Sequence, residues 1–342
     1  MSLLRWWWRG VGLLAGASIL VASVAPQALA PVNTPRCPVN EKLVPSCGAL
    51  WGITPPAPTR ASLQQVEQAV GRKFDFVYRF HDINDQIPDS EDRAIMNSGS
   101  MMHIAIDPRD YSRPDLPTVR WPEIAEGAVD QQLWAQAIGI ASIGRPVFVT
   151  FDHEPDLGRK AGLGTPDGYK AAWRHVYDLF RRAHASNAVW VWVVSGDMAS
   201  AQTALSMWPG NDVVDWLSWE GYDFAGCQSG PPSASQSRSF SDAVLPFYTY
   251  LHDYGPAVGI DVEKPIMISE AGSAIASWTV NPAWYQEIPR FLSQYPQIRA
   301  VGLWDHGDRV DTCTFQFSTI PDRIEDVRRA GQAKWVNPLA PA

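Results

Sequence analysis

The sequence is poor in the features that mark several common classes of protein. Its 342 residues carry 28 Lys and Arg against 36 Asp and Glu, a formal net charge of −8. Nucleic-acid binding needs a basic face, so we expect no nucleic-acid partner. The sequence also has no glycine-rich phosphate loop and no H-E-x-x-H motif. We therefore expect no cofactor and no metal.

Cysteine is scarce, with four in the whole chain. No two of them have the C-x2-C spacing that is typical of zinc sites. An even number of cysteines in an exported chain predicts two disulfides, for which three pairings are possible. We favour Cys37–Cys47, a short clip near the N-terminus, and Cys227–Cys313, which would connect two late loops.

Long hydrophobic runs are also missing, except at the N-terminus. Residues 11–25 form an apolar run preceded by two arginines, and residues 28–30 read A-L-A, which is typical of a signal-peptide cleavage site. The run is shorter than the about 20 residues of a membrane span. We expect residues 1–30 to be a signal peptide and the protein to be secreted, with no stable membrane association. Because Pro31 follows the expected cut, an uncleaved anchor that keeps the protein at the cell envelope is the alternative.

Strand-like and helical segments alternate through the rest of the chain. Eight apolar, β-branched or aromatic segments begin at residues 49, 74, 101, 146, 188, 213, 265 and 298. Most are continuously apolar, as in strands that are buried on both faces. Eight strand–helix units predict an α/β fold, a single (β/α)8 TIM barrel over residues 49–335. A doubly wound open sheet is the alternative. Residues 31–48 would be an N-terminal extension with a disulfide, and residues 336–342 a C-terminal tail.

Capping signals predict where several helices begin. Thr59 would cap a helix that ends at Gly71, and Thr165 before a proline would cap another. Asn281 before a proline predicts a third helix start. A fourth helix is expected over residues 321–331. The segment 227–239 is rich in Ser, Pro and Gly and is expected to be a loop.

Chemically active side chains stand at the ends of the predicted strands. In a barrel these carboxyl ends meet at one mouth, where active sites lie. Glu154 ends the fourth strand and Glu270 ends the seventh. Two carboxyl groups facing each other about 5–5.5 Å apart are what retaining glycoside hydrolysis requires. The charge of one raises the pKa of the other, so that one stays protonated near neutral pH.

Four motifs at the predicted strand ends are similar to those of a known protein family. "DHEPD" at the fourth strand, "WPGNDVVDWLSWEGYD" at the sixth, "IMISEAGS" at the seventh and "GLWDH" at the eighth together resemble glycoside hydrolase family 26. This family of retaining (β/α)8 glycosidases includes β-mannanases, lichenases and β-1,3-xylanases. The resemblance implies that Glu154 is the general acid/base and Glu270 the nucleophile. It further implies that His153 orients the acid, Tyr222 holds the nucleophile and Trp304 lines a sugar subsite.

Several other strand-end residues are candidate sugar contacts. We expect His103, Trp219 and Asp305 to bind substrate, with core packing as the alternative for His103 and Trp219. Glu220, a third carboxylate, is expected to help rather than to catalyse. The chain departs from the mannanase pattern after Glu154, after Glu270 and at Asp305, all of them sugar-binding positions.

The sequence thus predicts a secreted, monomeric, retaining endo-β-glycosidase with a two-glutamate double-displacement mechanism. Its partner would be a polysaccharide, with β-1,4-mannan favoured. A β-glucan, a β-1,3-xylan or a cell-envelope polysaccharide is an alternative substrate. A carbohydrate-binding barrel without turnover is a further alternative.

Overall fold

The computed structural model describes residues 37–109, 118–225, 227, 237–307 and 313–336. The chain divides into two units, Met1–Thr34 and Pro35–Ala342, and only the second contains described residues. The predicted signal peptide, most of the Ser/Pro/Gly-rich segment and nearly all of the C-terminal tail lie outside them. In the part of the chain that is described, no helix is long and apolar enough to cross a membrane.

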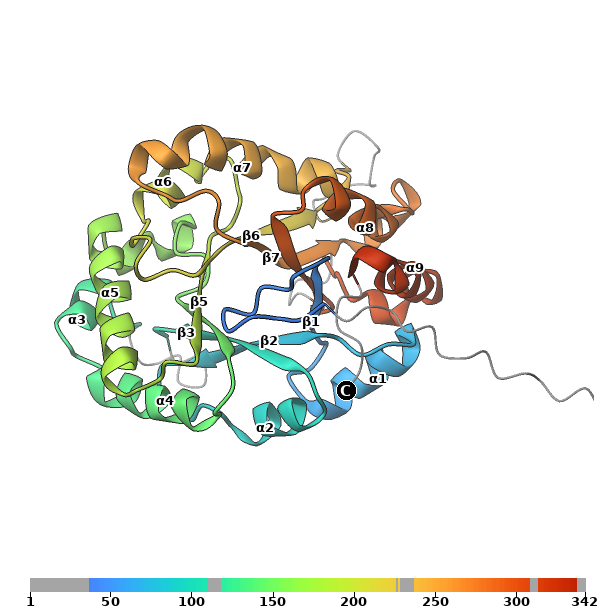
Figure 1. Cartoon of the computed structure of the whole chain (residues 1–342). Helices are drawn as coiled ribbons and strands as arrows, with labels where there is room; N and C mark the ends of the chain where they lie inside the picture. The colour runs from blue at the N-terminus through green and yellow to red at the C-terminus, as the bar shows by residue number, and fades with distance from the viewer. Residues whose placement is uncertain (1–36, 110–117, 226, 228–236, 308–312, 337–342) are drawn as a thin grey trace, which may run out of the picture. The chain divides into compact units, whose positions relative to one another are not determined.

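Eight parallel strands close into a barrel in chain order, β1 to β8. Strand β1 pairs with β8 in parallel, which closes the sheet and excludes the doubly wound alternative. The predicted TIM barrel is therefore confirmed, and Figure 1 shows the strands surrounded by helices. The strands are β1 (Leu50–Thr54), β2 (Phe76–Asp82), β3 (Met101–Asp107), β4 (Val147–Phe151), β5 (Ala188–Val193), β6 (Trp216–Asp223), β7 (Ile266–Ser273) and β8 (Ile298–Trp304).

Helices follow the strands and cover their outer faces. The α-helices are α1 (Arg60–Val70), α2 (Ser90–Asn97), α3 (Trp121–Ala125), α4 (Asp130–Ser142), α5 (Pro166–Arg182), α6 (Ala201–Ser206), α7 (Phe240–Tyr254), α8 (Trp284–Gln294) and α9 (Pro321–Gln332). Short 3-10 helices are η1 (Gly158–Leu163), η2 (Gly255–Val258), η3 (Ile275–Thr279), η4 (Phe317–Thr319) and η5 (Lys334–Val336).

Two of the three predicted helix starts are confirmed. The side chain of Thr59 accepts a hydrogen bond from the backbone of Ser62, and that of Thr165 accepts one from Gly168. The third prediction is wrong, because α8 begins after Ala283 and has no side-chain cap. Asn281 is used elsewhere: its side-chain amide donates a hydrogen bond to the carbonyl of Arg238.

Strands β6 and β7 run further than their hydrophobic segments suggest. Both acidic ends stay in the sheet, and a register shift between Trp219 and Glu220 brings Glu220 opposite Glu270. A bulge of this kind redirects the side chains that follow it. Two carboxylates thus become neighbours on adjacent strands.

The barrel has an inner and an outer apolar layer. The inner layer contains Phe76, Phe148 and Trp216, and the larger outer layer lies between strands and helices. The N-terminal segment closes the bottom of the barrel: Leu43 packs into the inner layer, and the Trp216 indole donates a hydrogen bond of 2.7 Å to the carbonyl of Lys42. The extension therefore completes the core.

Both favoured disulfides are present. Cys37 is bonded to Cys47 within the N-terminal segment. Cys227 is bonded to Cys313, which ties the segment after β6 to the segment after β8. No described cysteine is free. Disulfides of this kind are typical of exported proteins.

A glycine on β8 controls how closely β7 approaches it. A Cβ atom at Gly302 would lie 2.4 Å from the backbone oxygen of Ser269, the residue before Glu270. We expect Gly302→Ala to lower the free energy of unfolding by about 1–3 kcal/mol, since backbone must move. Thermal unfolding beside Gly162→Ala, where a Cβ meets nothing within 4 Å, is the measurement. Equal melting temperatures for the two variants would contradict the close approach.

Candidate active site

The site is built on an unusual backbone turn after β4. Asp152 and Glu154 both have a φ of 51°, a left-handed conformation that few non-glycine residues adopt. Such a conformation persists only where the surrounding structure holds it, and it is common at active sites. His153 lies between the two. The turn separates the three side chains, so that Asp152 faces a buried network while His153 and Glu154 join the carboxylates at the barrel mouth.

A buried lysine holds this turn. Lys160, in η1, forms ion pairs with Asp152 and, at 3.5 Å, with Asp107. Its ammonium group also donates a hydrogen bond of 2.5 Å to the carbonyl of His153. From the other side, the indole of Trp121 donates a hydrogen bond of 2.6 Å to Asp152, which is fully buried. Charge and hydrogen bonds therefore fix the backbone from which Glu154 projects.

Three carboxylates surround one imidazole nitrogen. Nε2 of His153 is 2.8 Å from Oε1 of Glu220, 3.6 Å from Oε1 of Glu270 and 3.8 Å from Oε2 of Glu154. All four residues are at most 9% exposed. The barrel thus brings together the two glutamates that the sequence singled out, from β4 and β7. Glu220, from β6, is a third carboxylate in the same group, within contact distance of His153.

Two tyrosines orient this group. The hydroxyl of Tyr222 donates a hydrogen bond of 2.6 Å to Oε2 of Glu270, which is the contact that the resemblance implied. The hydroxyl of Tyr78 lies 2.9 Å from Nδ1 of His153. A neutral imidazole accepts this hydrogen bond at Nδ1, which helps to fix the plane of a ring that lies among the acids.

Burial separates the pKa values of these groups. Burial lowers the pKa of His153 to about 4, so its imidazole is neutral. Burial and the charge of Glu154 raise the pKa of Glu270 to about 8. Burial and both neighbouring glutamates raise the pKa of Glu220 well above its usual range. The pKa of Glu154 is lowered: burial opposes this, but His153, a hydrogen bond from Glu220 and Arg159 outweigh it.

Trp304 lies beside the acidic group on its β8 side. Its ring is 6.1 Å from that of Phe80, which in turn packs edge-on against His153 at 5.1 Å. The Phe80 side chain is 39% exposed. These two rings form an apolar edge to the mouth, in the place where the resemblance puts a sugar subsite.

The structure places three predicted sugar contacts in the interior. His103 is fully buried: it stacks on Tyr78 at 3.8 Å, and its Nε2 is 2.7 Å from the hydroxyl of Thr150. His103 therefore supports Tyr78 and has no exposed surface for a sugar. His103 lies near the start of β3 rather than at its end, away from the mouth where the strand ends meet.

Trp219 and Asp305 are likewise corrected to interior positions. Trp219 is fully buried on the outer face of β6, where it packs 5.4 Å from Phe247. Asp305 is also fully buried, and its carboxylate accepts a hydrogen bond of 3.0 Å from the backbone of Ser318. Burial raises the pKa of Asp305 to about 7. Neither side chain has surface that could meet a substrate.

Beside Glu154 the mouth opens into a cavity of about 710 Å³. Residues from the ends of β4, β5 and β6 and from the start of α7 line it. They include Glu154, Arg159, Ser195, Glu220, Tyr222 and Arg238. The sequence alone did not predict a role for Arg159 or Lys160, because the residues after Glu154 stand out there only as a difference from the mannanase pattern. Two positive charges close to several acidic residues in the sequence could have indicated ion pairs here.

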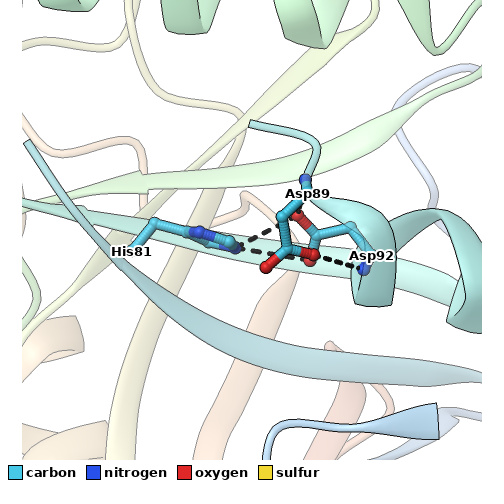
Figure 2. Close-up of side chains that lie close together, drawn as sticks. All are labelled: His81, Asp89 and Asp92. Carbon is cyan, nitrogen blue, oxygen red and sulfur yellow. Dashed lines mark hydrogen bonds and ion pairs between the residues drawn. The ribbon is translucent and has the colours of Figure 1, made fainter. Parts of the chain in front are cut away.

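Two groups of three potential metal ligands occur among the described residues. One is His153, Glu220 and Glu270, within the site above, and the other is His81, Asp89 and Asp92. Figure 2 shows this second group, at the end of β2 and the start of α2. Arg79 forms ion pairs with both of its aspartates. Burial opposes protonation of His81, yet hydrogen bonds to aspartates raise its pKa to about 9. Arg79 and the protonated His81 therefore already neutralise the two aspartates. Asp89 and Asp92 also form the capping box of α2, so both have a structural role.

Comparisons with known proteins support the class of glycoside hydrolases for this chain. Endoglucanase H of Acetivibrio thermocellus is 29% identical over 294 residues, which cover 82% of this chain and 30% of that protein. A β-1,3-xylanase from a Vibrio species is 33% identical over 96 residues, 28% of this chain and 20% of that protein. The chain thus spans a third or less of these relatives. No protein-family model matches the chain.

Solved structures share the fold. A GH26 β-mannanase from Bacteroides ovatus superposes with a TM-score of 0.58 at 15% identity, covering 84% of this chain and 89% of that one. The catalytic domain of a GH26 endo-β-1,4-mannanase from Bacillus sp. JAMB-750 gives 0.57 at 14% identity, covering 85% and 88%. At these identities the neighbours show that the chain shares their barrel fold.

The Lys160 network predicts a positioning role that can be separated from stability. Lys160→Met leaves Asp152 buried without its partner and should lower the free energy of unfolding by about 3–5 kcal/mol. Adding Asp152→Asn removes that charge and should recover much of the stability. The hydrogen bond to the carbonyl of His153 stays lost, so turnover should remain about tenfold lower with KM little changed.

Chemical unfolding and steady-state kinetics measure these effects. Lys170→Met is the matched control, because Lys170 pairs with Asp167 on the surface of α5. A double variant with full turnover would show that Lys160 acts on stability alone.

The raised pKa of Glu270 predicts a pH-dependent stability. Between pH 4.5 and about 8 the folded state holds a proton that the unfolded state releases. The contribution of Glu270 is therefore complete below this window and is lost as the pH rises through it. We expect wild type to lose unfolding free energy relative to Glu270→Gln as the pH rises from about 4.5 to about 8, because Gln cannot titrate there. Parallel curves for the two proteins would contradict this.

Proposed function

We propose that the protein is a secreted, monomeric, retaining endo-β-glycosidase that hydrolyses a β-linked polysaccharide. The observation that supports this most is the pair of buried carboxylates, Glu154 and Glu270, which both lie within 3.8 Å of one nitrogen of His153. Retaining enzymes need their two carboxyl groups close together, at about 5–5.5 Å. The two disulfides are compatible with export.

In the proposed reaction Glu270 attacks the anomeric carbon while Glu154 gives a proton to the departing glycosidic oxygen. A covalent glycosyl-enzyme forms, and the leaving part of the chain carries away that proton. Glu154 then takes a proton from water, whose oxygen displaces Glu270 and releases a sugar with retained configuration. Tyr222 would hold Glu270 through its hydrogen bond and favour the ionised form.

The proton has to lie on Glu154 when the bond breaks. In the empty site the pKa of Glu154 is lowered and that of Glu270 is raised. These carboxyl groups titrate as one coupled set, so a change around either redistributes the proton. Substrate that covers Glu154 and displaces the positive charge beside it would raise its pKa, and Glu270 would then ionise.

For the substrate, β-1,4-mannan is the first choice, and a β-glucan or a β-1,3-xylan comes next. The structural neighbours include mannanases, while the sequence relatives are an endoglucanase and β-1,3-xylanases. Trp304 and Phe80 supply the apolar edge on which a sugar ring of any of these polymers can stack.

Product release from a panel of polysaccharides tests the proposal. Wild type should release reducing sugar from at least one of mannan, β-glucan and β-1,3-xylan. Glu270→Ala should lower kcat by several orders of magnitude, because no nucleophile remains. Glu154→Ala should lose far less on aryl glycosides with activated leaving groups, which need little protonation. Activity that survives Glu270→Ala, or equal losses on both substrate types for Glu154→Ala, would contradict the assigned roles.

A further inference from the structure

The cavity lies on one side of the proposed bond cleavage. Its wall includes Glu154, Glu220 and Tyr222, whereas Glu270 and Trp304 are not among the described residues that line it. In a retaining mechanism the acid stands beside the departing oxygen and the nucleophile stands beside the anomeric carbon. The cavity beyond Glu154 is therefore the place for the leaving-group part of the glycan.

The wall of this cavity is charged. Two arginines line it, Arg159 from η1 and Arg238 from the residues before α7. The Arg159 side chain is 63% exposed, and Arg238 is also exposed. The aromatic rings of Phe224 and Tyr222 lie on the same wall. Among the exposed described residues that line the cavity, Asp197 is the one with a negative charge.

Arg159 stands where it affects the proposed acid directly. Its guanidinium forms an ion pair with Oε2 of Glu154. That positive charge stabilises the carboxylate, whereas a general acid has to hold a proton. Arg159 must therefore leave Glu154 before the glycosidic bond is protonated. Because its side chain is largely exposed, it can turn toward another anion in the cavity.

We propose that the leaving-group side of the site binds a negatively charged group of the glycan, a carboxylate or a phosphate, through Arg159 and Arg238. The inference rests on the proposed function and specifies its substrate class. Guanidinium groups bind both kinds of anion through paired, charge-assisted hydrogen bonds. Arg238 can contribute because its guanidinium forms no hydrogen bond or ion pair with another residue in the described ranges.

Binding of the anion and activation of the acid are then one event. A charged glycan draws Arg159 away from Glu154, and the carboxyl group of Glu154 takes up the proton it needs. A neutral glycan competes less well for Arg159, so Glu154 holds its proton in a smaller fraction of the complexes and turnover is slower. The site would discriminate by turnover as well as by affinity.

The test uses one backbone in three forms: neutral, oxidised to carboxylate at C6, and phosphorylated. β-Glucan and β-mannan can both be prepared in these three forms, which share one backbone and differ in the charged group that they carry. Wild type should cleave one of the charged forms at least tenfold faster, in kcat/KM, than the neutral form. The carboxylated and phosphorylated arms distinguish the two sources of charge.

Three variants identify the groups responsible. Arg159→Gln and Arg238→Gln should each reduce the preference for the charged form by about tenfold, the size of one charge-assisted contact. Arg159→Gln should also move the alkaline limb of the pH profile on a neutral aryl glycoside to higher pH, because Glu154 loses a positive neighbour. Arg181→Gln is the control, since this exposed arginine lies on the far end of α5.

The outcomes are separable. Equal rates on neutral and charged polymers, or a preference unchanged in both cavity variants, would overturn the inference while leaving the glycosidase intact. If wild type cleaves no polymer, the proposed function fails. Calorimetric binding of the charged polymers to wild type and to the Arg159→Gln/Arg238→Gln double variant then decides the inference, and absence of binding to wild type would overturn it.

Discussion

Three carboxyl groups lie within 3.8 Å of one imidazole nitrogen in a site that is almost completely buried. The rest of the structure has to stabilise this concentration of acidic groups. Buried charges are costly unless they are paired or neutralised. His153 cannot neutralise them as a cation, because burial itself keeps its ring neutral. The group therefore retains protons, on Glu220 above all. A site that stores protons among closely coupled acids can move one of them with little change in structure, which is what a double displacement demands of its acid and its nucleophile.

The backbone supplies this arrangement through three local devices. A register shift after Trp219 brings Glu220 opposite Glu270, and two left-handed residues turn the end of β4. Lys160 then anchors that turn from below the mouth, away from the cavity. Each device costs some stability alone, and each is held by the large apolar layers of the barrel. The fold thus provides the rigidity that a two-acid site requires within a fraction of an ångström.

Sequence reading recovered the barrel because its strands are long apolar runs and their order is fixed by closure. The motifs near the strand ends also led to Glu154, Glu270 and Tyr222, which do lie together at the mouth, and to Trp304; their roles stay predictions. Sequence reading failed where position and direction mattered: His103 lies near the start of β3, Trp219 lies within β6 and Asp305 follows β8, and all three are buried. It underestimated Glu220, since a bulge leaves no pattern in hydrophobicity. Asn281 has the sequence pattern of a helix cap, but its side chain instead donates a hydrogen bond to the carbonyl of Arg238.

The two sides of the mouth follow different chemistry. Trp304 and Phe80 are not among the described residues that line the cavity, and together they form a flat apolar edge that suits any sugar ring. On the side of the acid stand Arg159 and Arg238, and here the chain leaves the mannanase pattern directly after Glu154. A charge beside the proposed acid acts on both binding and proton supply, because Arg159 pairs with Glu154 and also lines the cavity. The wall of the cavity can therefore set which polymer is cleaved while the two proposed reacting carboxylates stay the same.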